Sequence, residues 1–407
     1  MIYMRRIPGI IYRKRCIVFS AVAILVFVII ILLHWGILCS NIQAWHHVSY
    51  LCELYRKGRV IGSLCTALCV DGQFHTLTCH PLHAGKDAVF SANWMIQGTP
   101  RAVFKAVRLA VDGEKDYLAE NMVYTTDKDG NKKYPSEAEF EAMLAALVSS
   151  KLNISVPREK LQKLGHLGPS ALEGLHGTSS DKRKREMEAV WFLLQGHEYL
   201  VSVLFEEREV FPRVVGTCGP YFASEWVDPL LWEESKEEWI NRVHAAVLVL
   251  ELLEALEDSV PAFRLCDVRP GDFGITNDGS KAKVLDSDTA LPQAVADKMT
   301  SDNKPCSKDE DCHYLDCKSS CHKGLCSEPV LNNNLQVVCD KVFLNQKLPG
   351  GAVVLPGLLM SEHTPSSLTA LLRLCVDHPS GEGADYVRKK LYGTLSQMEM
   401  ALIDETI

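Results

Sequence analysis

The hydrophobic pattern of this chain begins with one long apolar run close to the N-terminus. From Ile17 to Leu33 only Ser20 is polar, and the apolar character continues to Cys39. About twenty apolar residues are enough to cross a bilayer. The run is longer than the core of a cleaved signal peptide, and no small-x-small cleavage site follows it. We therefore predict an uncleaved signal anchor over residues 16–39.

Charge on either side of this run indicates its orientation. Residues 1–15 hold five basic side chains and no acidic one, and the next Lys or Arg is Arg56. The positive-inside rule then leaves the N-terminus in the cytosol and the rest in the lumen, as in a type II membrane protein. Thirteen of the 15 cysteines lie beyond Cys39, which suits an oxidising compartment.

Shorter apolar runs predict the elements of the lumenal part. Residues 40–80 carry four cysteines among glycine and polar residues, which favours a disulfide-tied stem or cap. Two β-rich runs, 88–94 and 102–107, flank a Gly-Thr-Pro turn and predict a hairpin. Further elements are predicted from spacing: helices at Ser136–Ser149, Glu186–Leu204 and Trp239–Leu256, and strands at Arg213–Gly216 and Tyr221–Val227.

One carboxylate interrupts the apolar stripe of the helix predicted at Glu186–Leu204. Glu198 lies four residues after Leu194 and three before Val201, both on that stripe. Burying a lone carboxylate costs several kcal/mol unless a cation meets it. Taken alone, Glu198 is most simply placed at the edge of the stripe, where it reaches solvent.

Four aspartates surround a second predicted hairpin. The turn Thr276–Ser280 joins two short apolar strands; Asp267 and Asp272 precede the hairpin, and Asp286 and Asp288 end it. Because a hairpin brings its ends together, these carboxylates can share one site. Such a group of oxygens suits a hard cation, Mg²⁺ or Mn²⁺, that carries a phosphate ester. A single acidic residue here would be only a turn or capping residue.

The segment Asp267-Val-Arg-Pro-Gly-Asp272 resembles the catalytic loop of protein kinases. Asp286 then stands where the kinase Asp-Phe-Gly element belongs. Lys105 resembles the lysine of the third kinase strand, and Glu198 stands where the helix glutamate that pairs with that lysine belongs. These kinase-like elements follow one another in the order of a kinase domain and cover most of residues 81–300. This order implies an α+β, bilobal, protein-kinase-like fold, placed in the lumen behind the signal anchor and carrying disulfide-rich insertions.

The resemblance also implies roles for these residues. Lys105 would orient the α and β phosphates of ATP, and Glu198 would hold Lys105. Asp286 and Asp272 would bind the metal, Mg²⁺ or Mn²⁺. Asp267 would orient an acceptor hydroxyl and accept its proton.

Several positions depart from the kinase pattern. Cys266 replaces the loop arginine, Asp272 replaces asparagine, and Ser287 and Asp288 replace Phe-Gly. We find no Ala-Pro-Glu element and no Gly-x-Gly-x-x-Gly loop ahead of Lys105. Two functions therefore stay open: a phosphotransferase, and a non-catalytic pseudokinase that binds a partner in the endoplasmic reticulum.

The block from Cys306 to Cys326 narrows the resemblance. With Asn332–Lys341 after it, the block resembles the divergent protein kinase domain 1 family, nearest its C-type branch, which implies a single-pass type II protein of the endoplasmic reticulum. The block has no Cys-x-x-Cys pair, so structural zinc fits poorly and disulfides fit better. Counting Cys339 there are six cysteines, which allow fifteen pairings.

These observations divide the chain into regions and limit its partners. The lumenal part is acidic, at −13 (38 basic against 51 acidic residues), so the membrane is an expected partner, a lumenal protein partner stays unidentified and nucleic acid is excluded. The predicted regions are a basic tail at 1–15, the anchor at 16–39, the stem or cap at 40–80, an N-lobe at 81–227 with an insert at 108–185, and a C-lobe at 228–407 with a cysteine-rich segment at 306–339.

Three further motifs resemble known functional patterns: a calcium loop, a glycosylation sequon and an Asp-x-Asp triplet. Asp127, Asp129 and Gly130 resemble part of a calcium loop, but Ser136 stands where the bidentate glutamate belongs, so a plain turn is expected and calcium is not. Asn153-Ile154-Ser155 is a glycosylation sequon. The Asp286-Ser287-Asp288 triplet would suit a lumenal glycosyltransferase, although that function leaves Lys105, Glu198 and Asp267 without a role.

Overall fold

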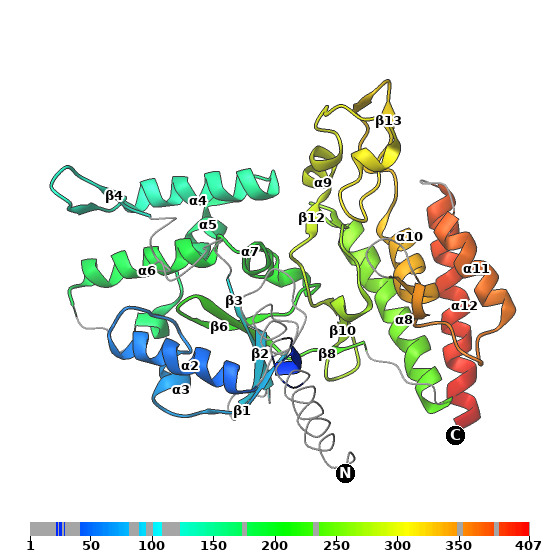
Figure 1. Cartoon of the computed structure of the whole chain (residues 1–407), viewed down its shortest axis with the longest axis horizontal. Helices are drawn as coiled ribbons and strands as arrows, with labels where there is room; N and C mark the ends of the chain where they lie inside the picture. Colours follow the sequence, from blue (N-terminus) through cyan, green and yellow to red (C-terminus); the bar gives the residue numbers. More distant parts are fainter. Residues whose placement is uncertain are drawn as a thin grey trace, which may run out of the picture. The chain divides into compact units, whose positions relative to one another are not determined.

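The chain folds into two compact units, each formed from separate stretches of sequence (Figure 1). The first unit takes residues 1–117, 168–176 and 215–224, and the second takes residues 118–167, 177–214 and 225–407. This computed structural model describes residues 41–80, 89–94, 101–107, 123–172, 177–230, 236–347, 353–377 and 382–406, with five isolated positions between 22 and 28.

A five-stranded sheet forms the centre of the first unit, in the order β1-β2-β3-β7-β6. The predicted hairpin is confirmed, because β2 and β3 pair antiparallel with Phe90 opposite Phe104 and Val89 opposite Lys105. The elements of this unit are α2 (Asn41–Arg56), α3 (Cys65–Cys69), β1 (Phe74–Cys79), β2 (Val89–Trp94), β3 (Arg101–Ala106), η1 (Pro169–Leu172), β6 (Val214–Cys218) and β7 (Tyr221–Glu225).

Apolar packing and disulfides hold this unit together. Phe90 and Phe104 are both 1% exposed, and their rings stack with centroids 5.0 Å apart. Cys52 pairs with Cys69, which joins α2 to α3, and Cys65 pairs with Cys218, which ties α3 to β6 of the sheet. Residues 40–80 therefore supply two helices and an edge strand to the first unit.

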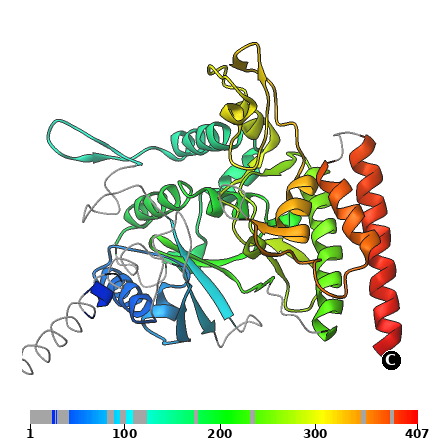
Figure 2. The same cartoon turned by 45° about the vertical axis from the view of Figure 1, so that its right-hand side comes forward.

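The second unit is built around the long helix α8 (Lys236–Glu257), which confirms the helix predicted at 239–256. Helix α8 packs along α12 (Glu382–Thr406) and contacts the strands β9, β10 and β11 (Figure 2). Arg242 of α8 is buried and donates to the carbonyls of Gly357, Leu358 and Met360. The other elements after α8 are β9 (Phe263–Leu265), η3 (Pro270–Asp272), β10 (Phe273–Ile275), β11 (Ala282–Val284), β12 (Ala290–Pro292), α9 (Gln293–Thr300), η4 (Asp309–Cys312), β13 (Cys321–His322), β14 (Leu325–Cys326), α10 (Asn334–Val338), the π-helical η5 (Cys339–Leu344), β15 (Asn345–Lys347), β16 (Val353–Pro356) and α11 (Ser366–Asp377).

The elements ahead of α8 confirm one predicted helix and correct another. Helix α4 begins after Ser136, whose hydroxyl accepts from the Glu139 amide in a capping box, and Asn153 follows its last residue in the left-handed conformation. The helix predicted over 186–204 is wrong as a single element. The elements here are β4 (Thr125–Thr126), β5 (Lys132–Lys133), α4 (Glu137–Leu152), α5 (Arg158–Leu164), α6 (Ser179–Leu193), α7 (His197–Leu204), η2 (Glu206–Arg208) and β8 (Asp228–Pro229).

The break between α6 and α7 has a local cause. The amides of Gln195 and Gly196 bond to carbonyls three residues back, and Gly196 is extended (φ −73°, ψ 122°). Lys151 of α4 donates to the Gln195 carbonyl that the break exposes. An apolar stripe with spacings of three, four and seven passes across such a break, so periodicity alone did not reveal it.

The predicted anchor lies outside the described residues, apart from the five isolated positions. Within the part of the chain that the structure describes, no helix combines the length and apolarity that a membrane span needs.

Candidate functional site

A short hairpin carries most of the predicted site residues. Strands β10 and β11 pair antiparallel, with Phe273 opposite Val284, which confirms the hairpin predicted there. Asp278 closes the turn: its carboxylate accepts from the hydroxyls of Thr276 and Ser280, and these bonds lower its pKa to about 2. At the other end, the Leu285 amide donates to the Asp272 carbonyl at 2.6 Å, which joins the two sides of the hairpin where the acidic residues begin.

Asp267 lies in the loop between β9 and β10. Arg269 donates from Nη2 to its Oδ2 at 2.6 Å, and the two side chains are partly exposed (Asp267 29%, Arg269 46%). The Arg269 amide donates to Asp272 Oδ2 at 2.7 Å. The loop thus presents one carboxylate paired with a guanidinium and a second carboxylate held by the backbone.

Asp272 carries the most perturbed carboxyl group of this hairpin. Burial and the nearby charge of Asp286 raise the pKa of Asp272 to about 7, and Asp267 adds to the rise. Asp272 therefore lies within electrostatic reach of both Asp267 and Asp286. A divalent cation would relieve this concentration of negative charge.

Glu198 belongs to the same acidic group. Ligand oxygens of Glu198, Asp286 and Asp288 all lie within 4.8 Å of one another. Glu198 is 5% exposed and therefore buried. The expectation for Glu198 taken alone, that it reaches solvent at the edge of the apolar stripe, is wrong. Helix α7 is placed by its first residue, because His197 donates from Nε2 to the Ala290 carbonyl at 2.9 Å, and burial lowers the pKa of His197.

The donor set of this group fits a hard divalent cation. Carboxylate oxygens are the ligands that Mg²⁺ and Mn²⁺ prefer, and the partly buried setting keeps water from screening their charge. Of these residues, Asp286 and Asp272 were predicted as metal ligands. Asp288 was predicted to share a cation site with the other aspartates of the hairpin and to serve as the second aspartate of an Asp-x-Asp motif, but it was not among the metal ligands of the kinase prediction.

Lys105 lies on β3 of the first unit and is 7% exposed. The residues with which it was predicted to act, Glu198 and Asp286, belong to the second unit. The pairing of Lys105 with Glu198 therefore stays a prediction.

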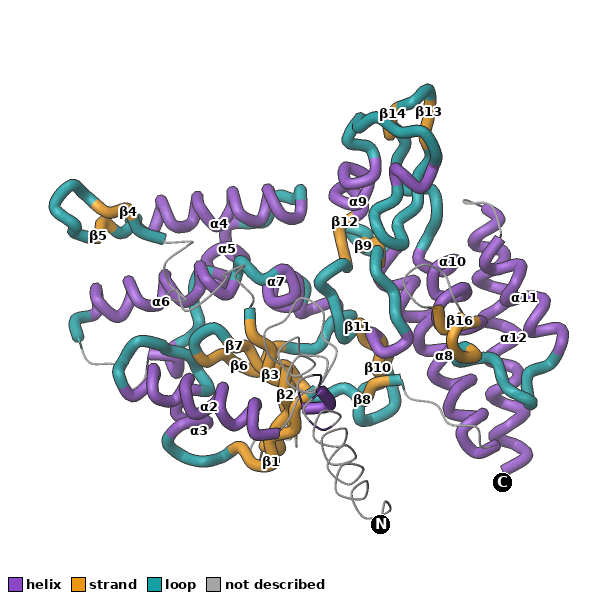
Figure 3. Tube along the Cα trace, viewed as in Figure 1, coloured by secondary structure: helices purple, strands orange, loops and turns teal. Residues whose placement is uncertain are grey.

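The cysteine-rich segment is fully oxidised in the part that the structure describes, which confirms disulfides. The segment is mostly loop, with two short paired strands, β13 and β14 (Figure 3). The expectation that its six cysteines pair among themselves is wrong for two of them, because Cys317 and Cys339 reach partners outside the block. The pairs are Cys266–Cys317, Cys306–Cys321, Cys312–Cys326 and Cys339–Cys375.

Two other motifs were considered as cation sites from sequence, and the structure shows which contacts their side chains make. The sulfurs of Cys306, Cys312 and Cys326 lie close together, but each is in a disulfide and offers no thiolate to zinc. Asp127 accepts from the amides of Asp129 and Asn131 at 2.9 and 2.8 Å, so its carboxylate closes the β4–β5 turn.

Comparison with known proteins supports a divergent kinase family. Residues 190–378 match the model described as the protein-kinase domain of FAM69, and residues 9–165 match the model described as the N-terminal cysteine-rich endoplasmic-reticulum part of FAM69. The chain is therefore similar to both parts described for FAM69, which supports the divergent kinase family. Residues 190–378 therefore form a protein-kinase-like α+β domain with several disulfides.

Two curated relatives are named as divergent protein kinase domain proteins. Divergent protein kinase domain 2A of Mus musculus is 29% identical over 236 residues, and the Homo sapiens protein of that name is 28% identical over 236 residues. In each case the match covers 53% of this chain and 53% of the relative, so this chain spans about half the length of the relatives it matches. These relatives support the divergent kinase family, and they do not support the C-type branch of domain 1.

Sequence reasoning missed a group of residues that hold the candidate site. Asp316 and Asn334 contact the loop and the strand around Asp267, and Asn332 donates to the Asp316 carbonyl, as described below. Asn332 and Asn334 had been noted only as marks of the family, and nothing local in the sequence indicates which loop they reach.

Proposed function

We propose that this chain is a kinase-like protein of the secretory pathway that binds ATP with Mg²⁺ or Mn²⁺ and transfers phosphate to a hydroxyl group of a lumenal acceptor. One observation carries the proposal. The carboxylates of Glu198, Asp286 and Asp288 converge within 4.8 Å, beside an Asp272 whose pKa is raised to about 7. A divalent metal bound there would neutralise charge on the transferring phosphate.

The other residues take roles around that centre. Asp267 orients the acceptor hydroxyl and accepts its proton, and its ion pair with Arg269 holds the carboxylate in position. Lys105 orients the α and β phosphates. Catalysis of phosphate transfer requires mainly positioning and charge neutralisation, and buried, pre-arranged carboxylates and cations supply both.

The setting in the cell is part of the proposal. We place the chain as a single-pass type II protein of the endoplasmic reticulum membrane, anchored by residues 16–39. The description of the N-terminal family model and the disulfides of both units support an oxidising compartment. Membership of the C-type branch of domain 1 rests on the cysteine block alone.

A thermal-shift panel on the purified full chain in detergent is the first test. We expect stabilisation by ATP with Mn²⁺ or Mg²⁺ that is larger than with either component alone. Stabilisation by a UDP-sugar with Mn²⁺ and none by ATP would instead support a glycosyltransferase that uses Asp286 and Asp288. No response to any nucleotide would contradict the proposal.

Transfer itself is tested with labelled ATP and broad acceptor mixtures. Asp286→Ala should abolish transfer, because it removes a metal ligand, while Asp278→Asn on the same hairpin should retain it. If the wild-type chain binds ATP and metal yet transfers nothing, the non-catalytic pseudokinase is the correct function.

Lys105 is tested by its effect on nucleotide binding. Lys105→Met should weaken the stabilisation by ATP, since a buried cation is lost, whereas Lys133→Met, at an exposed lysine of β5, should not. Unchanged stabilisation in Lys105→Met would remove this lysine from the site.

A further inference from the structure

Asp316 contacts the backbone on both sides of Asp267. The Asp316 amide donates to the Cys266 carbonyl at 2.7 Å, and Asp316 Oδ2 accepts from the Val268 amide at 2.8 Å. The two groups that it holds belong to the residues immediately before and after Asp267. One residue of the cysteine-rich segment therefore brackets the candidate catalytic aspartate.

A covalent bond reinforces this bracket. Cys317, the next residue after Asp316, is disulfide-bonded to Cys266, and both cysteines are buried. Lys341 pairs with Asp316 Oδ1, and the Asp316 side chain is 13% exposed. Both oxygens of the Asp316 carboxylate therefore have a partner: Oδ2 accepts from the Val268 amide, and Oδ1 pairs with Lys341.

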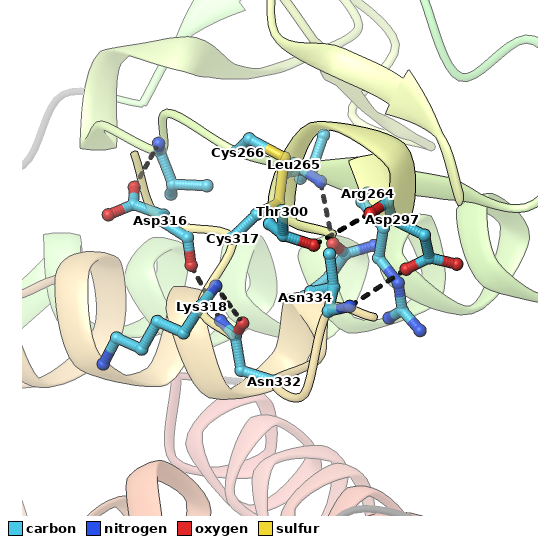
Figure 4. Close-up of a disulfide and its surroundings, with 12 residues drawn as sticks. Arg264, Leu265, Cys266, Asp297, Thr300, Asp316, Cys317, Lys318, Asn332 and Asn334 are labelled. Atoms are coloured by element: carbon cyan, nitrogen blue, oxygen red, sulfur yellow. Dashed lines mark hydrogen bonds between the residues drawn. A yellow bond between two sulfur atoms is a disulfide. The ribbon is translucent and has the colours of Figure 1, made fainter. Parts of the chain in front are cut away.

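Two asparagines after the cysteine block hold Asp316 and the strand that leads to Asp267 (Figure 4). Asn332 donates to the Asp316 carbonyl at 2.9 Å and accepts from the Lys318 amide at 2.8 Å. Asn334, which is 1% exposed, accepts from the Leu265 amide at 2.9 Å and donates to the Phe263 carbonyl at 2.8 Å. The strand that leads to Asp267 and the residue that brackets it are held by two neighbouring asparagines.

The loop needs this support because its own strand is short. Strand β9 has three residues and pairs with β12, with Leu265 opposite Ala290, and the Cys266 amide then donates to the carbonyl of Thr289, just ahead of β12. Beyond that point, the hydrogen bonds described for the Cys266 carbonyl and the Val268 amide, the groups next to Asp267, are those to Asp316.

We propose that Asp316 is a positioning residue for Asp267, and that the Cys266–Cys317 disulfide and Asn332 hold Asp316 in place. The inference rests on the proposed phosphate transfer. A displacement of about 1 Å at a reacting group can lower a rate about 100-fold, so a loop fixed at both neighbours of Asp267 matters for turnover more than for nucleotide binding.

The test compares Asp316→Ala, Asp316→Asn and Asp309→Ala in the full, oxidised chain. Asp309 is the control, because it also accepts a backbone amide, that of Cys321, elsewhere in the same segment. We expect Asp316→Ala to lower kcat for labelled phosphate transfer about tenfold or more, with the Kd for Mn²⁺-ATP within about twofold of wild type. Asp316→Asn should recover most of the rate, since its amide oxygen can accept from Val268.

Hydrogen exchange at the Val268 amide gives a readout that does not depend on activity. Exchange should be faster in Asp316→Ala, near wild type in Asp309→Ala, and faster to a smaller degree in Asn332→Ala, which also serves if Asp316→Ala does not fold. Unchanged exchange and unchanged kcat in the folded variants would overturn the proposal. A wild-type chain without transfer would defeat the proposed function alone, and the exchange rates would still decide whether Asp316 holds this loop.

Discussion

The strand that carries Lys105 and the loop that carries Asp267 are held in place by different means. Lys105 lies on a six-residue strand inside a five-stranded sheet, whose register and stacked aromatic rings fix it. Asp267 follows a three-residue strand, and a disulfide, a carboxylate and buried asparagines fix the chain around it. A long regular sheet positions a side chain through repeated weak contacts, whereas an irregular loop depends on a few individual bonds.

The largest effect should come from the aromatic packing beside Lys105. Phe104 is 1% exposed, stacks on Phe90 and meets Phe74 edge-on at 5.1 Å. Phe104→Ala should lower the stability of this sheet by about 3–5 kcal/mol, because it leaves a cavity between packed rings. Hydrogen exchange of the β2 amides measures this loss, with Phe104→Leu as a milder control. A loss below about 1 kcal/mol would mean that apolar packing does not position Lys105.

The second effect concerns the disulfide beside Asp267. Replacing Cys266 and Cys317 together by serine should cost about 2–5 kcal/mol in thermal or urea unfolding. The pair Cys306–Cys321 is the control, because it closes a loop of 15 residues where Cys266–Cys317 closes 51. Chain entropy predicts that the first double variant loses about 1 kcal/mol more than the second. The reverse order would show that loop length does not govern these bonds.

The third effect isolates one side chain. Asn334→Ala should cost about 1–3 kcal/mol, because the Leu265 amide and the Phe263 carbonyl lose their buried partner. Asn333→Ala is the matched neighbour: Asn333 caps α10 through the Gln336 amide, and losing such a cap costs about 1 kcal/mol. Equal losses would mean that the support of β9 is no stronger than an ordinary helix cap.

The same contrast explains what could be predicted from sequence. The β2–β3 hairpin, helices α4 and α8 and the β10–β11 hairpin all repeat a local pattern, and each was predicted close to its true bounds. The placing of Asp272 near both Asp267 and Asp286 followed from the hairpin and from the kinase resemblance. The break at Gly196 and the bond of Cys266 to Cys317 depend on one residue or on a distant partner, and neither leaves a periodic signal.

The smallest expected effect concerns a charged contact at the turn of the acidic hairpin. His244 of α8 donates from Nε2 to the Gly279 carbonyl at 3.0 Å and from Nδ1 to Glu399 of α12 at 2.5 Å. Both partners are acceptors, so the doubly protonated ring satisfies both. Burial alone would lower the pKa of His244, but these two bonds and the charge of nearby Glu251 raise it above 6.5 overall.

The sign of the pH dependence follows from this raised pKa. The contact contributes fully below about pH 6.5, the pKa of an unfolded histidine, and its contribution is lost as pH rises through the higher folded value. The difference in Tm between wild type and His244→Gln should therefore shrink between pH 6 and pH 9, and Glu399→Gln should shift that change to lower pH. Because the His244 side chain is 41% exposed, solvent screens the pair and the change is small. A difference in Tm that grows with pH would mean that the ring is neutral in the folded chain, and that the hairpin turn is held to α8 and α12 without an ionic contact.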